Sequence, residues 1–232
     1  MKKIKYYLSN VDDGNLALHI GDDKNIVLDN RAKLAKKLDK SIDDFVYMNQ
    51  IHSGISSIVN ISDKGIGTLE IDENMSCDSL VTNEKGLVLS VLVADCVPVL
   101  FYDDNAGVVG VAHAGWKGTV QKVLENTIKN MLSLGANIDD INVIIGPCIS
   151  IDSYEVGKYV GCQFRQEVII DKHDGKQNLD LTRQNYLDLL DLGIKADNIE
   201  IINVDTFTNS NYFSARRDGF NNGRFGYFIY IK

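Results

Sequence analysis

The sequence predicts an α/β (α+β) fold, a layered domain in which a mixed β-sheet is covered by helices. Two observations lead to this prediction. Segments with strand-like patterns outnumber segments with helical spacing, and two of the most apolar segments flank a turn, which is typical of a hairpin. Because no Pro-, Ser- or Gly-rich linker interrupts the chain, residues 1–232 are expected to form a single domain.

The first half of the chain is expected to supply one helix and four strands. Residues 29–39 predict a helix behind an Asp or Asn cap, because apolar residues recur there at helical intervals. Residues 45–51 and 55–61 predict strands separated by a turn. Residues 87–102 are the most hydrophobic segment and predict one strand buried on both faces. A second buried strand at 108–113 is expected to pair with it as a hairpin.

The second half alternates helical and strand-like patterns. Residues 120–132 have the spacing of one helix, which Gly135 is expected to end. Another helix is expected to follow Asp180 and to close at Gly193. Three further strands are predicted, at 141–145, 199–204 and 225–231.

The composition excludes several classes of protein. Lys and Arg number 24 against 32 for Asp and Glu, a net charge of −8, which argues against a nucleic-acid partner. The longest apolar run is far shorter than the roughly 20 residues that span a bilayer, so no membrane partner is expected. The lysines near the start are not followed by the apolar stretch of a secretory signal, and we expect a cytoplasmic protein.

The four cysteines lie far apart without a CxxC pair, so a disulfide framework is not expected. Of the four histidines, His19 and His173 lie in polar segments and are expected to be solvated. Cys77 and Cys148 are interpreted as packing residues. These exclusions leave few side chains for metal or acid–base chemistry.

Two segments do not fit an inert core. Asp95 and Cys96 interrupt the most apolar segment. Burying an unpaired carboxylate in such a segment costs roughly several kcal/mol of folding free energy. His113 lies among small residues where a buried strand meets a helix start. The hairpin would bring Cys96 near His113, and His52 follows another strand end before Gly54. Two imidazoles and one thiolate with an open position are typical of catalytic zinc. The structural alternative is a Cys that serves as a small hydrophobic residue and His side chains satisfied locally.

Arginines gather near the C-terminus, at positions 216, 217 and 224. They favour either a surface turn held by salt bridges or a binding site for phosphate or carboxylate.

Several motifs in a fixed order resemble the YfiH-like family, whose members are called laccase-domain proteins or polyphenol oxidases and, later, purine nucleoside phosphorylases. The motifs include NQIHSG, CDSLVT, VLVADCVPVLFYD, GVAHAGWKGT and FSARRDG, and the resemblance covers residues 14–229. It implies a layered α/β domain with a metal site at His52, Cys96 and His113. It also implies cleavage of adenosine, inosine and methylthioadenosine by phosphate, and deamination of adenosine. Asp205 departs from the family, which often has Cys there.

The working hypothesis is a zinc enzyme that acts on small nucleosides and phosphate. Zinc held by the trio would present hydroxide to the purine, and Asp95 is a candidate proton shuttle. Phosphate would be held by basic side chains, for which the candidates are Arg31, Lys117, Arg216 and Arg224. The sequence indicates no oligomeric state.

Three alternatives remain open at this point. Copper is a possible metal for two His and one Cys, but a multicopper oxidase needs a further histidine cluster that this chain does not have. Cys96 could be the nucleophile of a cysteine hydrolase with His113 as base, as in an enzyme that edits peptidoglycan precursors. A metal-binding protein with a closed site is the non-enzymatic alternative.

Overall fold

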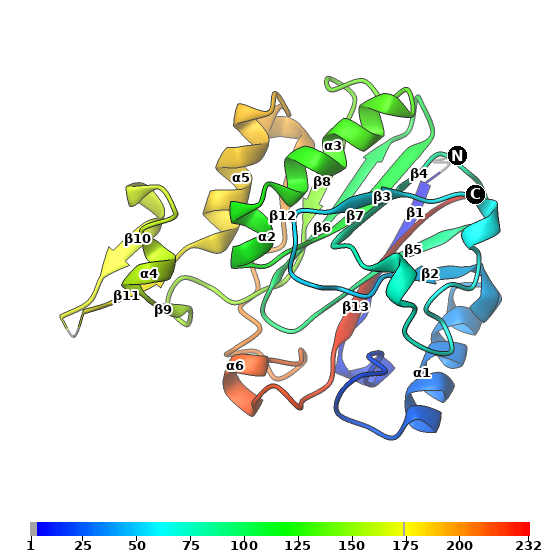
Figure 1. The fold of residues 1–232 in the computed structure, drawn as a ribbon, viewed down its shortest axis with the longest axis horizontal. Coiled ribbons are helices and arrows are strands. Elements are labelled where there is room, and N and C mark those ends of the chain that lie inside the picture. The colour runs from blue at the N-terminus through cyan, green and yellow to red at the C-terminus, as the bar shows by residue number, and fades with distance from the viewer. Residues whose placement is uncertain (1–3, 174) are drawn as a thin grey trace.

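The computed structural model describes residues 4–173 and 175–232. Within these ranges, two large β-sheets pack face to face, and helices cover the outer face of each (Figure 1). The prediction of a layered α/β fold with sheets covered by helices is confirmed. The single mixed sheet that the sequence predicted is, however, divided into two sheets, and the described residues form a small third one.

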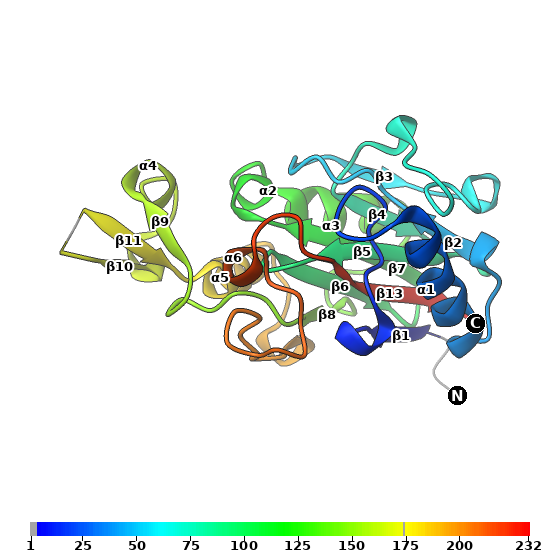
Figure 2. The same cartoon turned by 90° about the horizontal axis from the view of Figure 1, so that it is seen from below.

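The strand order of the first sheet is β1–β13–β5–β2, with the bounds Ile4–Leu8, Phe225–Ile231, Val88–Val93 and Phe45–Tyr47. The order of the second is β12–β8–β6–β7–β4–β3, with the bounds Ile199–Ile201, Asn142–Ile145, Val97–Asp103, Val108–Ala114, Ser79–Thr82 and Ser56–Ile58. The third is β10–β11–β9, with the bounds Ile169–Asp171, Lys176–Leu179 and Glu155–Gly157. Figures 1 and 2 both show this third sheet projecting from one end of the molecule.

The α-helices are α1 to α6, with the bounds Lys24–Lys37, Trp116–Val120, Val123–Ser133, Lys158–Gly161, Leu181–Asp191 and Ala215–Asp218. Short 3-10 turns η1 to η6 lie at Val11–Asp13, Ile42–Asp44, Ile61–Asp63, Glu73–Met75, Gln166–Val168 and Ala196–Asn198. None of the helices in the described ranges combines the length and hydrophobicity that a bilayer crossing requires.

Three apolar layers hold the sheets and helices together. Strand β13 has the nearly continuous apolar run that is typical of a strand buried on both faces, and its side chains point alternately into two cores. Its Phe225, Tyr227 and Ile229 enter the core between the two large sheets, whereas Phe228 and Tyr230 pack toward α1. On the far side of the second sheet, side chains of α3 and α5 cover β6, β7 and β8. The pairing of β13 with β1 places residues near the two ends of the described chain side by side (Figure 1).

The prediction of one strand at 87–102 is wrong, because the chain passes from one sheet to the other in the middle of this segment. Strand β5 belongs to the first sheet and β6 to the second, and residues 94–96 form the connection between them. Asp95 takes a left-handed conformation there, with φ of 87°. The apolar run is therefore two strands that line the same core from opposite sides. The hairpin prediction is confirmed, since β6 pairs antiparallel with β7 and Pro98 lies opposite His113.

Other boundaries differ for local reasons. Helix α1 begins before 29–39, because the Asp23 side chain caps it by accepting the backbone N–H of Asn25. The helix predicted at 120–132 is divided into α2 and α3 at Lys122, which has φ of 64°. The strands at 45–51, 55–61 and 199–204 are shorter than predicted. Strands β1, β4, β9, β10 and β11 were missed because they are short or polar.

Replacement of Leu100 by Ala tests the packing between the two sheets. Leu100 is 1% exposed in the shared core, so we expect a loss of about 2–5 kcal/mol in the free energy of unfolding. Ile170, which is 52% exposed in β10, provides the control, and its replacement by Ala should change the free energy by no more than about 0.5 kcal/mol. Urea unfolding measures both, and equal effects would contradict the packing of the two sheets.

Candidate metal centre

Three side chains from separate segments converge at one end of the second sheet. His52 follows β2, Cys96 precedes β6, and His113 lies in β7. Their potential ligand atoms all lie within 4.8 Å of one another, and the two imidazole rings are 4.7 Å apart between centroids. His113 is buried, Cys96 is half-buried and His52 is exposed, so the cluster leads from the core to the surface. The structure thus brings together all three residues of the predicted trio.

Asp78 organises this cluster, although the sequence analysis gave it no role. Its buried carboxylate lies 2.8 Å from Nδ1 of His113. Its two oxygens also accept the backbone N–H groups of His52 at 3.0 Å and Ser53 at 2.6 Å, and the Ser53 hydroxyl at 2.8 Å. Since Nδ1 of His113 donates to Asp78, Nε2 is the nitrogen left to act as a ligand. The bonds from His113 and Ser53 outweigh burial and lower the pKa of Asp78.

Cys96 and His113 carry opposite charges in the metal-free protein. Burial opposes ionisation of the thiol, but His113, assisted by His52, outweighs it and lowers the pKa of Cys96 to about 6. Burial also opposes the imidazolium form, but Cys96 and Asp78 outweigh it and raise the pKa of His113 to about 9. At neutral pH the pair is therefore a thiolate and an imidazolium. A divalent cation could take the place of the shared proton.

A glycine makes room for the cluster. Gly115 lies directly after β7, and a Cβ atom there would come within 3.0 Å of the Cys96 Sγ and 3.5 Å of the His52 Cδ2. The small residues around His113 therefore serve a definite purpose, since a side chain at position 115 would push against two of the three possible ligands.

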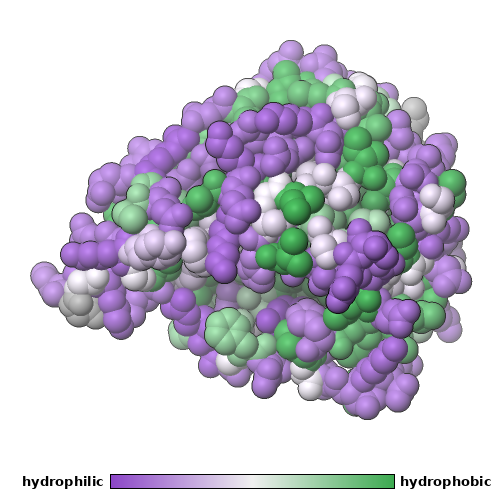
Figure 3. Space-filling view, in the orientation of Figure 1, coloured by the Kyte–Doolittle hydropathy of each residue, from purple (hydrophilic) through white to green (hydrophobic). Residues whose placement is uncertain are grey.

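The cluster opens into a pocket of about 340 Å³, called the site pocket below. Its wall has an apolar part that includes Tyr47, Leu92 and Phe220, of which Phe220 is 83% exposed. Another part is made by the guanidinium groups of Arg31 and Arg224 and the imidazole of His19. Figure 3 shows this side of the molecule hollowed below its centre, above the segment that carries α6. The site pocket is large enough for a small polar ligand with an aromatic part.

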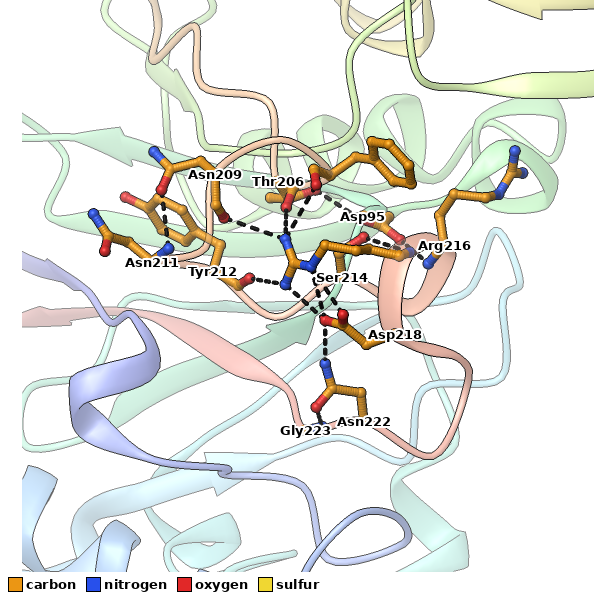
Figure 4. A network of polar contacts seen from close by, with 12 residues as sticks. Asp95, Thr206, Asn209, Asn211, Tyr212, Ser214, Arg216, Asp218, Asn222 and Gly223 are labelled. Carbon is orange, nitrogen blue, oxygen red and sulfur yellow. Dashed lines mark hydrogen bonds and ion pairs between the residues drawn. The ribbon is translucent and has the colours of Figure 1, made fainter.

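Asp95 lies beside the cluster in sequence, but its carboxylate is engaged elsewhere. One oxygen accepts the Thr206 hydroxyl at 2.7 Å, and the other accepts the backbone N–H of Arg216 at 2.7 Å, as Figure 4 shows. These bonds tie the connection between the two sheets to the start of α6. They explain how a carboxylate that is 8% exposed is accommodated there. The role of Asp95 as a proton shuttle stays a prediction.

The basic residues predicted from sequence separate into two groups. Arg31 and Arg224 line the site pocket, whereas Arg216, Arg217 and Lys117 do not. Arg217 is bound by Asp218 and by the backbone carbonyl groups of Thr206 and Tyr212. Arg216 lies over the Tyr154 ring and donates to the Glu155 carbonyl, and Figure 4 shows its side chain directed away from Asp95. Lys117 lies over the ring of Trp116.

The remaining cysteines and histidines agree largely with their interpretation as structural or solvated residues. Burial raises the pKa of Cys77 to about 11 and that of Cys148 to about 12, so both thiols stay neutral at pH 7. His173 is exposed. His19 is exposed as well, but it lines the site pocket, which the sequence gave no reason to expect.

Comparison with known sequences reveals relatives along nearly the whole chain. A family model described as multi-copper polyphenol oxidoreductase laccase matches residues 5–232. A protein named adenosine deaminase RL5, from an unknown prokaryotic organism, is 37% identical over 230 residues, which cover 94% of this chain and 87% of that protein. The purine nucleoside phosphorylase YlmD of Bacillus subtilis is 34% identical, with coverage of 94% and 82%.

Solved structures of the same fold are also known. The hypothetical protein YfiH of Bacillus licheniformis has a TM-score of 0.90 and 33% sequence identity, covering 94% of this chain and 85% of that one. YlmD of Geobacillus stearothermophilus has a TM-score of 0.88 at 33% identity, with coverage of 94% and 84%. The arrangement of the two large sheets is therefore shared with these proteins.

Replacement of Asp78 by Asn tests the carboxylate behind His113. An amide removes the negative charge and one acceptor, so Nδ1 of His113 loses its orientation, and we expect metal affinity to fall roughly 10- to 100-fold. Asp103→Asn is the matched control, because Asp103 is also buried and bonded to backbone N–H groups but lies at the far end of β6. Competition with a chelating dye measures the affinity. Equal losses in both variants would contradict a specific role for Asp78.

Alkylation of the metal-free protein tests the charge state of Cys96. With its pKa lowered to about 6, the thiolate predominates at pH 7 and is protonated only as the pH falls through about 6. The rate of reaction with iodoacetamide, followed by mass spectrometry of the Cys96 peptide, should therefore be half-maximal near pH 6. An unperturbed cysteine is half-maximal near pH 8.5, roughly. In His113→Ala the midpoint should rise, and an unchanged midpoint would exclude His113 as the cause.

Proposed function

The chain belongs to the multi-copper polyphenol oxidoreductase laccase family, and from this premise we propose that it is a zinc-dependent enzyme of nucleoside metabolism. It cleaves adenosine, inosine and S-methyl-5′-thioadenosine with phosphate and also deaminates adenosine. The observation that carries the proposal is the convergence of His52, Cys96 and His113 at the wall of the site pocket. The names of the relatives supply the substrate class, and we retain the cytoplasmic location as part of the proposal.

The donor set fits zinc. Two imidazoles and a thiolate are ligands that zinc accepts, and three protein ligands leave a position for water or substrate, as in catalytic sites. Such an ion would supply Lewis acidity and a bound water of lowered pKa. Copper also accepts these donors. An oxidase with several copper ions is not favoured, because His19 and His173 are the only other histidines in the sequence.

The surrounding residues have distinct roles in this proposal. Asp78 holds His113 in one tautomer, and Phe220 and Leu92 offer apolar surface for a purine ring. In phosphorolysis, a phosphate oxygen bonds to the anomeric carbon as the glycosidic C–N bond breaks, and the proton of hydrogen phosphate leaves with the purine. In deamination, a water oxygen bonds to C6 of the purine and the bond from C6 to the amino nitrogen breaks. One proton of the water leaves with the amino group as ammonia, and the other remains on the purine ring. The site must therefore hold an anion in one reaction and water in the other.

A cysteine hydrolase is the second candidate, and one observation favours it. Cys96, His113 and Asp78 form a series of thiolate, imidazolium and carboxylate, the arrangement that activates a nucleophilic cysteine. An enzyme that edits peptidoglycan precursors by hydrolysis would use this arrangement without a metal. The two candidates differ in whether activity requires a metal ion.

Metal content and turnover of the wild-type protein and of His113→Ala distinguish the candidates. We expect about one zinc per chain in the wild type, with adenine released from adenosine when phosphate is present and inosine formed without it. In His113→Ala, both activities should fall at least about 100-fold together with the metal content. Mass spectrometry measures the metal, and chromatography measures the products.

His173→Ala is the control, because this histidine is exposed and does not line the site pocket. A wild-type protein that is metal-free yet active would contradict the zinc mechanism and favour Cys96 as the nucleophile. A zinc protein that leaves adenosine untouched would contradict the nucleoside substrate.

A further inference from the structure

The site pocket is lined by two guanidinium groups, those of Arg31 and Arg224, in a chain of net charge −8. The imidazole of His19 lines it beside them, together with the trio. Among the residues that the structure describes, the only carboxylate in its wall is that of Asp72, which accepts the backbone N–H of Asn74. Guanidinium groups in a pocket are usually paired with carboxylates, so two without such a partner point to an anionic ligand.

Arg31 is the more deeply buried of the two guanidinium groups. It is 3% exposed, its guanidinium lies 3.8 Å from the centre of the Tyr47 ring, and Nε donates to the Leu16 carbonyl. Nη1 donates to two further carbonyl groups, at Gly67 and Thr68. Nη2 donates to no residue in the part of the chain that the structure describes. All three partners are neutral, so the positive charge of Arg31 is oriented but not neutralised.

Arg224 is held in the same way. Its Nη1 donates to the carbonyls of Asn222 at 2.6 Å and Gly223 at 3.0 Å, and Nη2 lies 3.4 Å from the carbonyl of Phe220. Nε has no hydrogen-bond partner within the described ranges. These backbone contacts fix the guanidinium in place and leave its charge unpaired by any carboxylate hydrogen bond. A fixed fork of this kind suits a tetrahedral oxyanion.

One buried amide joins the segments that carry Arg224 and His19. Asn15 is 2% exposed, and its Nδ2 donates to the carbonyl of Ile20 at 2.8 Å. Its Oδ1 accepts the backbone N–H of Arg224, also at 2.8 Å. Asn15 therefore sets the distance between residue 224 and the loop that contains His19. Partial burial, followed by the charges of Arg224 and Arg31, lowers the pKa of His19.

We propose that Arg224 and His19, with Arg31 as a fixed charge behind them, form the binding site for inorganic phosphate, and that Asn15 is the positioning residue that holds the two together. This inference rests on the proposed function, since it names the place of the co-substrate in phosphorolysis. Phosphate bound there would share the site pocket with the trio and with a nucleoside. Arg216, Arg217 and Lys117 are not assigned to this role, because none of them lines the site pocket.

Phosphate binding to the metal-loaded protein tests the site without requiring turnover. Calorimetry at constant ionic strength measures the Kd of inorganic phosphate for the wild type, Arg224→Met and His19→Ala. We expect the Kd to rise roughly 10- to 100-fold in Arg224→Met, as the loss of a charge-assisted contact predicts, and less in His19→Ala. His19 makes no hydrogen bond to the described residues and is exposed, so its replacement leaves the fold intact.

Arg183→Met is the matched control, because Arg183 is exposed on α5, over the Tyr186 ring and away from the site pocket. Its Kd for phosphate should equal that of the wild type. A Kd unchanged in both Arg224→Met and His19→Ala would overturn the proposal, as would the absence of phosphate binding to the wild type. Adenosine 5′-monophosphate is titrated separately. If it binds through Arg224 while free phosphate does not, the site serves a substrate phosphate and the co-substrate assignment is overturned.

Kinetics on the same variants separate this proposal from the proposed function. In Arg224→Met the KM for phosphate should rise, whereas in Arg183→Met it should stay at the wild-type value. Phosphate binding through Arg224 without any adenine release would support the anion site and contradict phosphorolysis. Adenine release with a KM for phosphate that is unchanged in Arg224→Met would support phosphorolysis and overturn the anion site.

Discussion

The site depends on one buried carboxylate, that of Asp78. A charge removed from water is costly unless donors surround it, and here four hydrogen bonds, from His113, His52 and Ser53, do so. Because those donors belong to β7 and to the loop after β2, satisfying the carboxylate also fixes two of the three members of the trio. The same contacts therefore stabilise the fold and preorganise the cluster. Cys96 is the one member that Asp78 does not hold directly.

Cys96 is placed by the change of sheets between β5 and β6. A strand that continued straight would keep position 96 inside the first sheet, far from the hairpin partner of β6. The left-handed turn at Asp95 redirects the chain, and its carboxylate secures the turn through Thr206 and α6. The aspartate that looked anomalous in an apolar segment thus stabilises the backbone geometry that brings Cys96 to His113. This structural role accounts for the residue without assigning it to catalysis.

The sequence predicted the trio because His113 lies on a hairpin and Cys96 directly before it, and the pairing of the hairpin follows from a short turn between two apolar strands. His52 was added through its chemistry and through a family resemblance. Asp78 was not found, since its bond to His113 spans 35 positions and depends on how β4 lies beside β7. The division of 87–102 between two sheets was missed because both halves are apolar: they line one core from opposite sides, and nothing in their composition marks the change of sheet. His19 became relevant only because it lines the site pocket, where Asn15 joins its loop to Arg224 from the opposite end of the chain.

The zinc enzyme and the cysteine hydrolase would use the same lone pairs, those of the Cys96 sulfur and of the His113 imidazole. In the metal-free protein the Cys96 thiolate is stabilised by an imidazolium, and the proton on His113 occupies the nitrogen that a metal would need. Binding a divalent cation must displace that proton, and it commits the thiolate to coordination instead of nucleophilic attack. In a metal-loaded chain the Cys96 thiolate would therefore serve as a ligand. Replacement of the proton by a divalent cation also makes the site pocket more positive, so the metal and the unpaired arginines both favour an anionic co-substrate.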